Sequence, residues 1–255
     1  MKFAVVIPAY NEAATIRDVA TRALAQCPHV IVVDDGSTDG TAGAVAGLPL
    51  TLLRHETNQG KAASLWDGMQ HALARGAAAV ITLDADGQHR PEDIPQLIEM
   101  SERRPGEIII GSRMAEKSAF PRRRLVANQA ANFWISWASG YRISDSQSGF
   151  RLYPAALLQR IVVPHDHAHG FVFESEILIE AARLGVHSAP VPIAAIYQPG
   201  ARASHFRTVL DVLRIARMVA WKLFVRGFYP QGLYRSFIRL RLRALLPGGR
   251  AGRPT

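Results

Sequence analysis

The stretch Ala77-Ala-Ala-Val-Ile-Thr-Leu83, followed at once by Asp84-Ala-Asp-Gly-Gln-His89, shows how this chain is built. The first part is a short apolar run of the kind that forms a buried strand, and the second is a polar loop at its end. A helix is expected after the loop, because Pro91 suits a first helical turn and the next two residues are acidic. The unit is therefore a strand, a polar loop and a helix.

The polar loop carries a candidate metal site. One residue separates Asp84 from Asp86, so their side chains point the same way in an extended segment, and Gln88 supplies a third oxygen. Gly87 lets the chain turn sharply between them. Such oxygen ligands suit Mg²⁺ or Mn²⁺, which keep positions for water and substrate phosphates. Local turn chemistry is the alternative, because Asp also favours turns.

The same unit recurs along the first half of the chain. Apolar runs that predict strands cover residues 3–7, 29–33, 50–53 and 107–110, and each ends in a polar loop. Helical segments are expected at 13–26, 62–74 and after Pro91, with a short one following residue 41. Strands that alternate with helices predict an α/β fold with an open, mostly parallel sheet and ligands at the carboxyl ends of the strands.

The second half is less regular. Residues 122–141 and 171–184 are expected to be helical, a polar loop covers 145–151, and residues 186–196 return to strand character. Phe133, Trp134 and Trp137 in the first of these helices could cover a lipid chain, although aromatic residues at helical spacing also build cores.

Basic charge is concentrated at the C-terminus. Of 255 residues with a net charge of +9, residues 202–255 hold twelve Lys and Arg against Asp211 alone, a net charge of +11. Residues 1–201 therefore carry −2. Apolar and aromatic residues run through the basic segment, which favours an anionic lipid surface over nucleic acid as the partner.

The basic segment has helical periodicity. Its charged residues fall on about half of a helical wheel, which leaves an apolar side to face acyl chains in a helix that lies in a membrane interface. The charged set is Arg207, Asp211, Arg214, Arg217, Lys222 and Arg226, and the apolar set is Val212, Leu213, Val219, Leu223 and Phe224. The alternative is a helix packed on the protein's own core. We expect a catalytic domain at 1–206, amphipathic helices at 207–246 and a disordered tail at 247–255.

We expect neither a signal peptide nor a membrane-spanning helix. The apolar run at residues 3–7 is too short for a signal peptide, and the best apolar stretch near the C-terminus, 208–225, is interrupted by four charged residues. Cys27 is the single cysteine, so no disulfide is possible within the chain. We expect a cytoplasmic protein that binds peripherally to the inner face of the cytoplasmic membrane.

Three common phosphate or calcium motifs can be excluded. No Gly-x-Gly-x-x-Gly follows a predicted strand, and Gly60-Lys61 is not a Walker loop because His55 and Ala62 occupy its first and last positions. The segment from Asp35 starts like a calcium loop, but Ala46 replaces the closing Glu.

Six motifs in order resemble a known enzyme family. They are Val5-Ile-Pro-Ala-Tyr-Asn-Glu12, Asp34-Asp-Gly-Ser-Thr-Asp39, Asn58-Gln-Gly-Lys61, Asp84-Ala-Asp-Gly-Gln-His89, Gly111-Ser-Arg113 and Ser148-Gly-Phe-Arg151. Together they resemble the family 2 inverting glycosyltransferases of the GT-A fold, in particular the polyprenyl-phosphate, dolichyl-phosphate mannose synthase-like branch. The resemblance spans most of residues 1–206 and implies a single GT-A domain that uses a UDP- or GDP-sugar.

The resemblance implies roles for residues on the donor side. Pro8, Tyr10 and Glu12 would line the nucleoside pocket, and Asp35 would accept a hydrogen bond from the base. Lys61 would lie near the donor, and Asp84, Asp86 and Gln88 would hold Mg²⁺ or Mn²⁺ against its diphosphate.

It also implies roles on the acceptor side. Arg113 would contact the diphosphate or the acceptor phosphate, and acceptor contacts would also come from Arg122, Arg124, Arg151 and His205. A lipid phosphate needs no general base, because its oxygen is already anionic. A hydroxyl acceptor would need one, and Asp145 is then the candidate, with Glu174 or Glu176 behind it; Asp145 as a loop-capping residue is the alternative.

The sequence departs from this branch at its C-terminus. Many members end in transmembrane helices, whereas the basic segment here resembles short bacterial members without them, so the acceptor stays open. Two other functions compete with the glycosyltransferase hypothesis: a nucleotidyltransferase on a related sheet and a non-catalytic protein that binds membrane surfaces. Oligomeric state cannot be predicted from these features.

Overall fold

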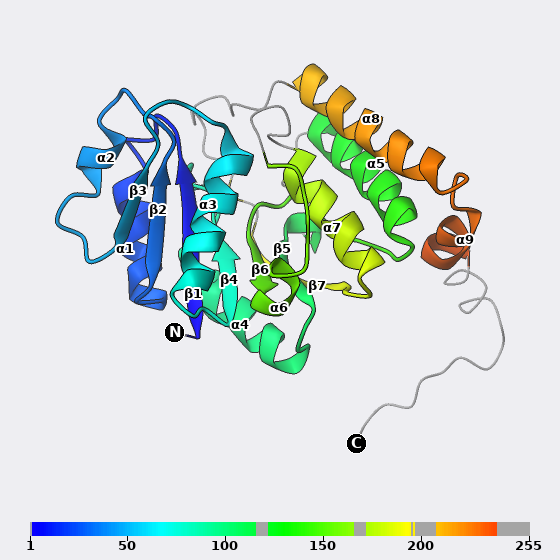
Figure 1. Ribbon diagram of the computed structural model, residues 1–255, viewed down its shortest axis with the longest axis horizontal. Helices are drawn as coiled ribbons and strands as arrows, with labels where there is room; N and C mark the ends of the chain where they lie inside the picture. The colour runs from blue at the N-terminus through cyan, green and yellow to red at the C-terminus, as the bar shows by residue number, and fades with distance from the viewer. Residues whose placement is uncertain (1, 116–121, 166–171, 195, 197–207, 239–255) are drawn as a thin grey trace.

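The fold is built on one seven-stranded sheet. A computed structural model describes residues 2–115, 122–165, 172–194, 196 and 208–238 (Figure 1). The strand order is β3-β2-β1-β4-β6-β5-β7. The strands are β1 Phe3–Ala9, β2 Val30–Asp34, β3 Thr51–Arg54, β4 Ala79–Thr82, β5 Ile108–Ser112, β6 Arg151–Pro154 and β7 Ser188–Pro192.

Most of the sheet is parallel, as the sequence predicts. β1 pairs in parallel with β2 and β4, β2 with β3, and β5 with β7. β6 is antiparallel to both of its neighbours, with Thr82 opposite Arg151. The sequence analysis missed β6 and the short helix α6 (Ala155–Leu158) that follows it. Both elements are only four residues long and contain no extended apolar alternation.

Helices cover the two faces of the sheet. Side chains alternate along β1, so Ala4 and Val6 join one core while Val5, Ile7 and Ala9 join the other. The first core is closed by α3 Lys61–Ala74, α5 Arg122–Ser139 and α7 Phe173–Arg183, and the second by α1 Ile16–Gln26 and α4 Ile94–Arg103. A short helix, α2 (Thr41–Ala44), follows β2, and a 3₁₀ turn at Pro91–Asp93 precedes α4.

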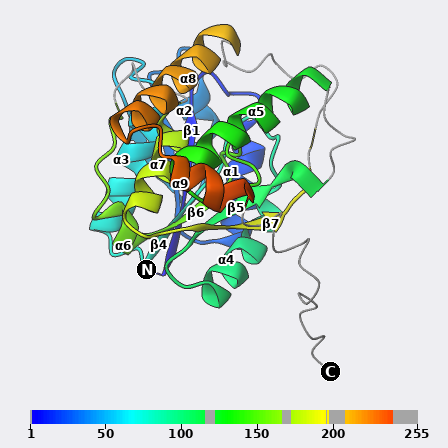
Figure 2. The same cartoon turned by 90° about the vertical axis from the view of Figure 1, so that its right-hand side faces the viewer.

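The basic segment forms a helix that packs on the protein. In α8 (Thr208–Val225), Ile215, Val219 and Leu223 are buried in the same core as α5 and α7, and the two views show α8 beside α5 (Figures 1 and 2). The prediction that Val219 and Leu223 face acyl chains is therefore wrong. The alternative, a helix packed on the core, describes this face of α8.

Lys222 also points inward. Its Nζ lies 2.7 Å from Glu176 Oε1 and contacts Glu180 as well, so it joins α8 to α7. Sequence periodicity had placed it among outward-facing charges. Arg226 donates to the Ala138 carbonyl at 2.9 Å and lies over the ring of Tyr229, so it too is held by the protein.

The outer side of α8 and the turn that follows it carry exposed aromatic side chains. Trp221, Phe224 and Phe228 are each more than 60% exposed, and Arg217 is exposed on the same helix. The chain then continues into α9 (Pro230–Leu233) and a π-helical turn at Tyr234–Ile238. Among the described residues no helix is both long and apolar enough to span a bilayer. The predicted tail at 247–255 lies outside the described residues.

Candidate active site

The site lies where β1, β2 and β4 end. These strands are neighbours and parallel, so the loops that follow them meet at one edge of the sheet. Pro8 lies near the end of β1, Tyr10 and Glu12 lie in the loop that follows, and all three are half-buried. Asp35 comes from the second, and the acidic pair comes from the third. The sequence motifs are thus brought together as the α/β pattern predicts.

The first two loops are tied to each other through Asn11. Its side-chain oxygen accepts a hydrogen bond from the Thr38 backbone N–H at 2.9 Å, and its own N–H donates to Ser37 Oγ at 2.9 Å. Thr41 Oγ1 accepts from the Glu12 N–H at 2.8 Å. Asn11 has a φ of 55°, a left-handed conformation that Asn tolerates better than most residues. This packing fixes the walls of the predicted nucleoside pocket.

The Asp35 carboxylate is almost fully buried, with its side chain 4% exposed. It accepts hydrogen bonds from the N–H groups of Gln59 and Gly60, both at 2.8 Å, and from His55 Nδ1 at 2.8 Å. A carboxylate has about four acceptor positions, so three of them are taken. The contact of Asp35 with a nucleobase stays a prediction and would use the remaining position.

Lys61 lies between two acidic groups. Its Nζ is 2.7 Å from Asp84 Oδ1 and 3.3 Å from Glu174 Oε2, and its side chain is 21% exposed. Burial raises the pKa of Asp84, but the charge and hydrogen bond of Lys61, together with the smaller effects of His89 and Arg113, outweigh burial, so the pKa is lowered. Glu174 had been considered only as a reserve base, and its Oε1 has no hydrogen-bond partner in the described part of the chain.

Asp86 behaves as half of a cation site. Burial and the charge of Asp84 raise its pKa to about 6, and its Oδ1 accepts from the Gln88 N–H at 2.9 Å. Two carboxylates that oppose each other's ionisation are stabilised by a divalent cation. No group of three or more His, Cys, Asp and Glu suited to a metal occurs in the described ranges. The two carboxylates with the Gln88 amide therefore fit Mg²⁺ or Mn²⁺ as a partial site that substrate phosphates complete.

Gly149 leaves the space that Asp84 occupies. A Cβ at this position would lie 2.5 Å from Asp84 Oδ2 and 2.9 Å from Oδ1. The loop before β6 therefore approaches the acidic pair closely, and only glycine allows it.

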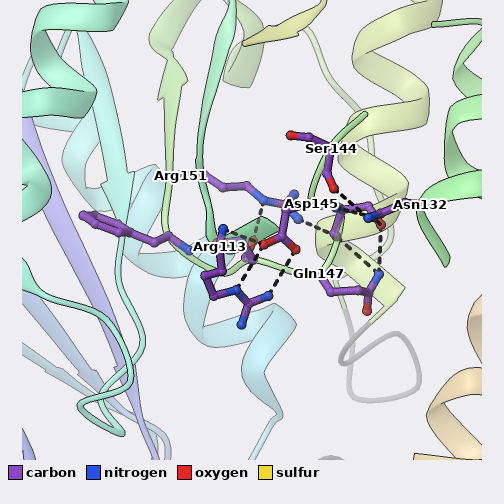
Figure 3. Close-up of polar contacts among 9 residues, drawn as sticks. Arg113, Asn132, Ser144, Asp145, Gln147 and Arg151 are labelled. Carbon is purple, nitrogen blue, oxygen red and sulfur yellow. Dashed lines mark hydrogen bonds and ion pairs between the residues drawn. The ribbon is translucent and has the colours of Figure 1, made fainter. Parts of the chain in front are cut away.

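Arg113 and Asp145 form a buried pair (Figure 3). Asp145 is fully buried and accepts from Arg113 three times, from the backbone N–H at 3.0 Å and from Nε and Nη2 at 3.1 Å each. Both carboxylate oxygens are thus occupied away from solvent. The prediction that Asp145 removes a proton from the acceptor is wrong in this arrangement. The alternative, a residue that caps its own loop, is not what the structure shows either, because the carboxylate binds Arg113, 32 residues away.

Asn132 holds the loop that carries Asp145. Its amide donates to the Ser144 carbonyl at 2.6 Å, and its oxygen accepts from the N–H and hydroxyl of Ser146 at 2.7 and 2.8 Å (Figure 3). The sequence analysis did not single out Asn132, because a lone Asn in a helix gives no local signal. Its partners lie 12 and 14 residues away in sequence, beyond the end of α5 at Ser139, and the turn after that helix brings them together.

Arg151 is enclosed by protein. It is fully buried and donates to the carbonyls of Ser146 and Ser148 at 2.7 Å, of Glu174 at 2.6 Å, and to Tyr153 Oη at 3.3 Å. The prediction that it contacts the acceptor is therefore wrong. Its role is to join the loop before β6 to the start of α7.

His89 is a buried group that the sequence analysis left without a role. Burial lowers its pKa to about 4, so the ring is neutral at pH 7. It stacks on Phe150 with centroids 5.7 Å apart, and neither ring nitrogen has a partner among the described residues.

The structure describes only some of the remaining residues that were predicted to contact the acceptor. Arg122 is exposed at the start of α5. Arg124 lies in the same helix, but its side chain and all of His205 fall outside the described residues. Their contacts with an acceptor stay predictions.

Comparisons with known proteins agree with this geometry. Residues 4–180 match the model of "Glycosyl transferase family 2". Polyprenol monophosphomannose synthase of Mycolicibacterium smegmatis is 30% identical over 74% of this chain and 75% of its own length. Undecaprenyl-phosphate mannosyltransferase of Micrococcus luteus is 30% identical over 77% and 84%.

Solved structures show the same fold. Glucosyl-3-phosphoglycerate synthase from Mycobacterium tuberculosis, crystallised with Mn²⁺, UDP and phosphoglyceric acid, covers 88% of this chain with a TM-score of 0.59 and 23% identity, and this chain covers 78% of it. The match supports a GT-A-like α/β domain. The protein is a glycosyltransferase and belongs to glycosyl transferase family 2.

Proposed function

We propose that the protein transfers a sugar, with inversion, from a UDP- or GDP-sugar to a lipid-linked phosphate at the cytoplasmic face of the membrane. The observation that carries this proposal is the cluster of Asp84, Asp86 and Lys61 beside the loops after β1 and β2. Relatives named for polyprenol and undecaprenyl phosphate support the acceptor class.

The donor would bind along the edge of the sheet. Tyr10 offers a ring for the base, and Glu12 a carboxylate for ribose hydroxyls. A divalent cation held by Asp84, Asp86 and Gln88 would neutralise the charge that grows on the diphosphate as it leaves.

Lys61 adds a fixed positive charge to the donor side. It lies against Asp84 and Glu174, so it is held close to the predicted metal ligands. Arg113 follows β5 and binds Asp145 through Nε and Nη2. The other edge of its guanidinium would be the one that contacts a phosphate. These cations favour a substrate that carries several phosphates.

A phosphate acceptor is favoured over a hydroxyl. Asp145, the first candidate for a general base, is fully buried against Arg113. A lipid phosphate needs no base, because its oxygen attacks as an anion on the face of the sugar opposite the leaving diphosphate.

The aromatic side of α8 supports binding to a membrane surface. Trp221, Phe224 and Phe228 are 64%, 61% and 62% exposed, and Arg214 and Arg217 are exposed on the same helix. Aromatic side chains beside arginines suit the boundary between acyl chains and anionic headgroups. This arrangement keeps the predicted membrane partner and keeps Arg214, Arg217 and Phe224 among the residues that would face it. Trp221 and Phe228 take the place of the buried Val219 and Leu223.

The test is nucleoside diphosphate release from a panel of UDP- and GDP-sugars, with Mn²⁺ or Mg²⁺ and with or without polyprenyl phosphate in anionic vesicles. We expect release from one donor that requires both metal and lipid phosphate. Asp84→Asn and Asp86→Asn should abolish it, whereas the surface substitution Asp18→Asn should not. Activity that survives both site substitutions would refute the proposal, and vesicle binding without release from any donor would favour a binding protein.

A further inference from the structure

His55 lies at the end of the edge strand, outside the groups already given a role. Its side chain is 9% exposed, and its backbone N–H donates to the Asp34 carbonyl at 2.9 Å. The residue follows β3 directly, so pairing between β2 and β3 brings its ring beside the loop after β2. The fold therefore fixes where this imidazole lies.

Both ring nitrogens of His55 face carboxylates. Nδ1 is 2.8 Å from Asp35 Oδ1, and Nε2 is 3.1 Å from Asp67 Oδ2 on α3. The two partners differ in solvation, because the side chain of Asp35 is 4% exposed and that of Asp67 is 48% exposed. Hydrogen bonds between charged or polar groups contribute more where water is excluded, so the contact with Asp35 is the stronger constraint.

Asp35 passes this constraint to the next loop. Its two oxygens accept from the N–H groups of Gln59 and Gly60. Gly60 has a φ of 97° and directly precedes Lys61, whose Nζ lies against Asp84. The orientation of one carboxylate is thus coupled to the chain segment from which Lys61 extends.

Close packing leaves these loops little freedom to compensate. A Cβ on Gly36 would lie 2.7 Å from the Thr57 carbonyl carbon and 2.8 Å from the Asn58 nitrogen, so the backbones of the two loops touch. A change in the Asp35 rotamer would therefore remove its hydrogen bonds rather than shift the loops with it.

We propose that His55 is a positioning residue for donor binding, which orients Asp35 and, through Gly60, the segment that carries Lys61. This inference rests on the proposed function, because it takes a nucleoside diphosphate sugar as the ligand. His55 does not contact the donor. His55 sets the direction in which Asp35 presents its remaining acceptor position to the base. It also helps to place the ammonium group of Lys61.

Two isosteric substitutions separate the contacts of His55. The side-chain N–H of His55→Asn falls near the position of Nδ1 and can still donate to Asp35, whereas that of His55→Gln falls near Nε2 and can reach only Asp67. The affinity for UDP and GDP is measured by calorimetry with Mn²⁺, and hydrogen exchange reports the amides of Gln59 and Gly60. Thermal unfolding checks the fold of each variant.

We expect His55→Gln to weaken nucleotide binding by about tenfold to a hundredfold, the effect of one charge-assisted hydrogen bond. Exchange at Gln59 and Gly60 should quicken in the same variant, KM for the donor should rise, and kcat should change little. His55→Asn should restore binding and exchange, and Asp67→Asn should behave like the wild type.

Two results would overturn the inference. One is a His55→Gln variant with the nucleotide affinity and exchange of the wild type. The other is an equal loss in both His55 variants that follows a lower unfolding temperature, which would make the role structural. If the wild type binds neither UDP nor GDP, the proposed function fails. The link between His55 and Asp35 is tested separately by hydrogen exchange. Unchanged exchange at Gln59 and Gly60 in His55→Gln would overturn that link even then.

Discussion

Replacing Arg151 by Met tests whether this side chain holds the site together or meets a ligand. The guanidinium is fully buried and donates to three backbone carbonyls at 2.6 to 2.7 Å. Met fills much of the same space but donates nothing, so three buried acceptors lose their partner. Each unsatisfied buried group costs about 1 to 3 kcal/mol.

The low end of that range applies, because Met also removes the cost of burying a charge. We therefore expect Arg151→Met to lower the free energy of unfolding by about 3 to 4 kcal/mol, a large part of the roughly 5 to 15 kcal/mol typical of a native protein. For a domain of this size the unfolding temperature should fall by about 10 °C. Arg151→Lys can serve one or two of the carbonyls and should lose about half as much.

The assay is thermal and urea unfolding of the two variants and of Arg142→Met, which replaces an exposed arginine in the same region as a control. The control should stay within about 0.5 kcal/mol of the wild type. If Arg151→Met melts within about 2 °C of the wild type and only raises KM for a lipid phosphate, the structural role of Arg151 is refuted. Its predicted contact with the acceptor would then be correct.

Three further predictions follow from single contacts. Gly149→Ala should displace the Asp84 carboxylate and lower kcat by about a hundredfold with little change in unfolding temperature, whereas Gly43→Ala, whose Cβ meets nothing within 4 Å, should be fully active. Lys222→Met removes the cation from between two α7 carboxylates, Glu176 and Glu180, of which Glu180 keeps its ion pair with Arg183. The variant should lower the free energy of unfolding by about 3 kcal/mol in urea titrations, and an unchanged midpoint would contradict this. The pKa of Asp86 is raised to about 6, so below pH 6 a cation must displace its proton. Mn²⁺ affinity measured by calorimetry should therefore fall about tenfold for each pH unit below 6 and level off above pH 6. An affinity independent of pH from 5 to 7 would count against the site.

The sequence predicts the parallel part of the sheet well. Strands β1 to β5 and β7 lie within a few residues of their expected ranges, because apolar runs and the polar loops after them are local features. The loops after these strands lie together as expected, because parallel neighbouring strands place their carboxyl ends at one edge of the sheet. The sequence analysis missed β6 because this strand is formed by pairing with Thr82 and its neighbours in β4, about 70 residues away in sequence.

The roles of charged residues were predicted less well. Arg151, Asp145 and Lys222 were all expected to face a ligand or a membrane, and all three are held by other parts of the protein. Backbone carbonyls are the main partners of Arg151, and every residue has one, so no residue type in the sequence marks them. Lys222 pairs with carboxylates more than 40 residues away.

The sequence by itself determined the parallel strands, the polar loops at their ends and the acidic pair that predicts a metal site. These depend on the identities of residues close together in the chain, where periodicity and turn preference act. Only the tertiary structure decided which charges face the site and which are buried against one another, and it joined His55, Asp35 and Lys61 into one linked set. Hydrogen bonds and ion pairs form between groups that packing brings within about 3 Å, and separation along the chain does not specify that distance.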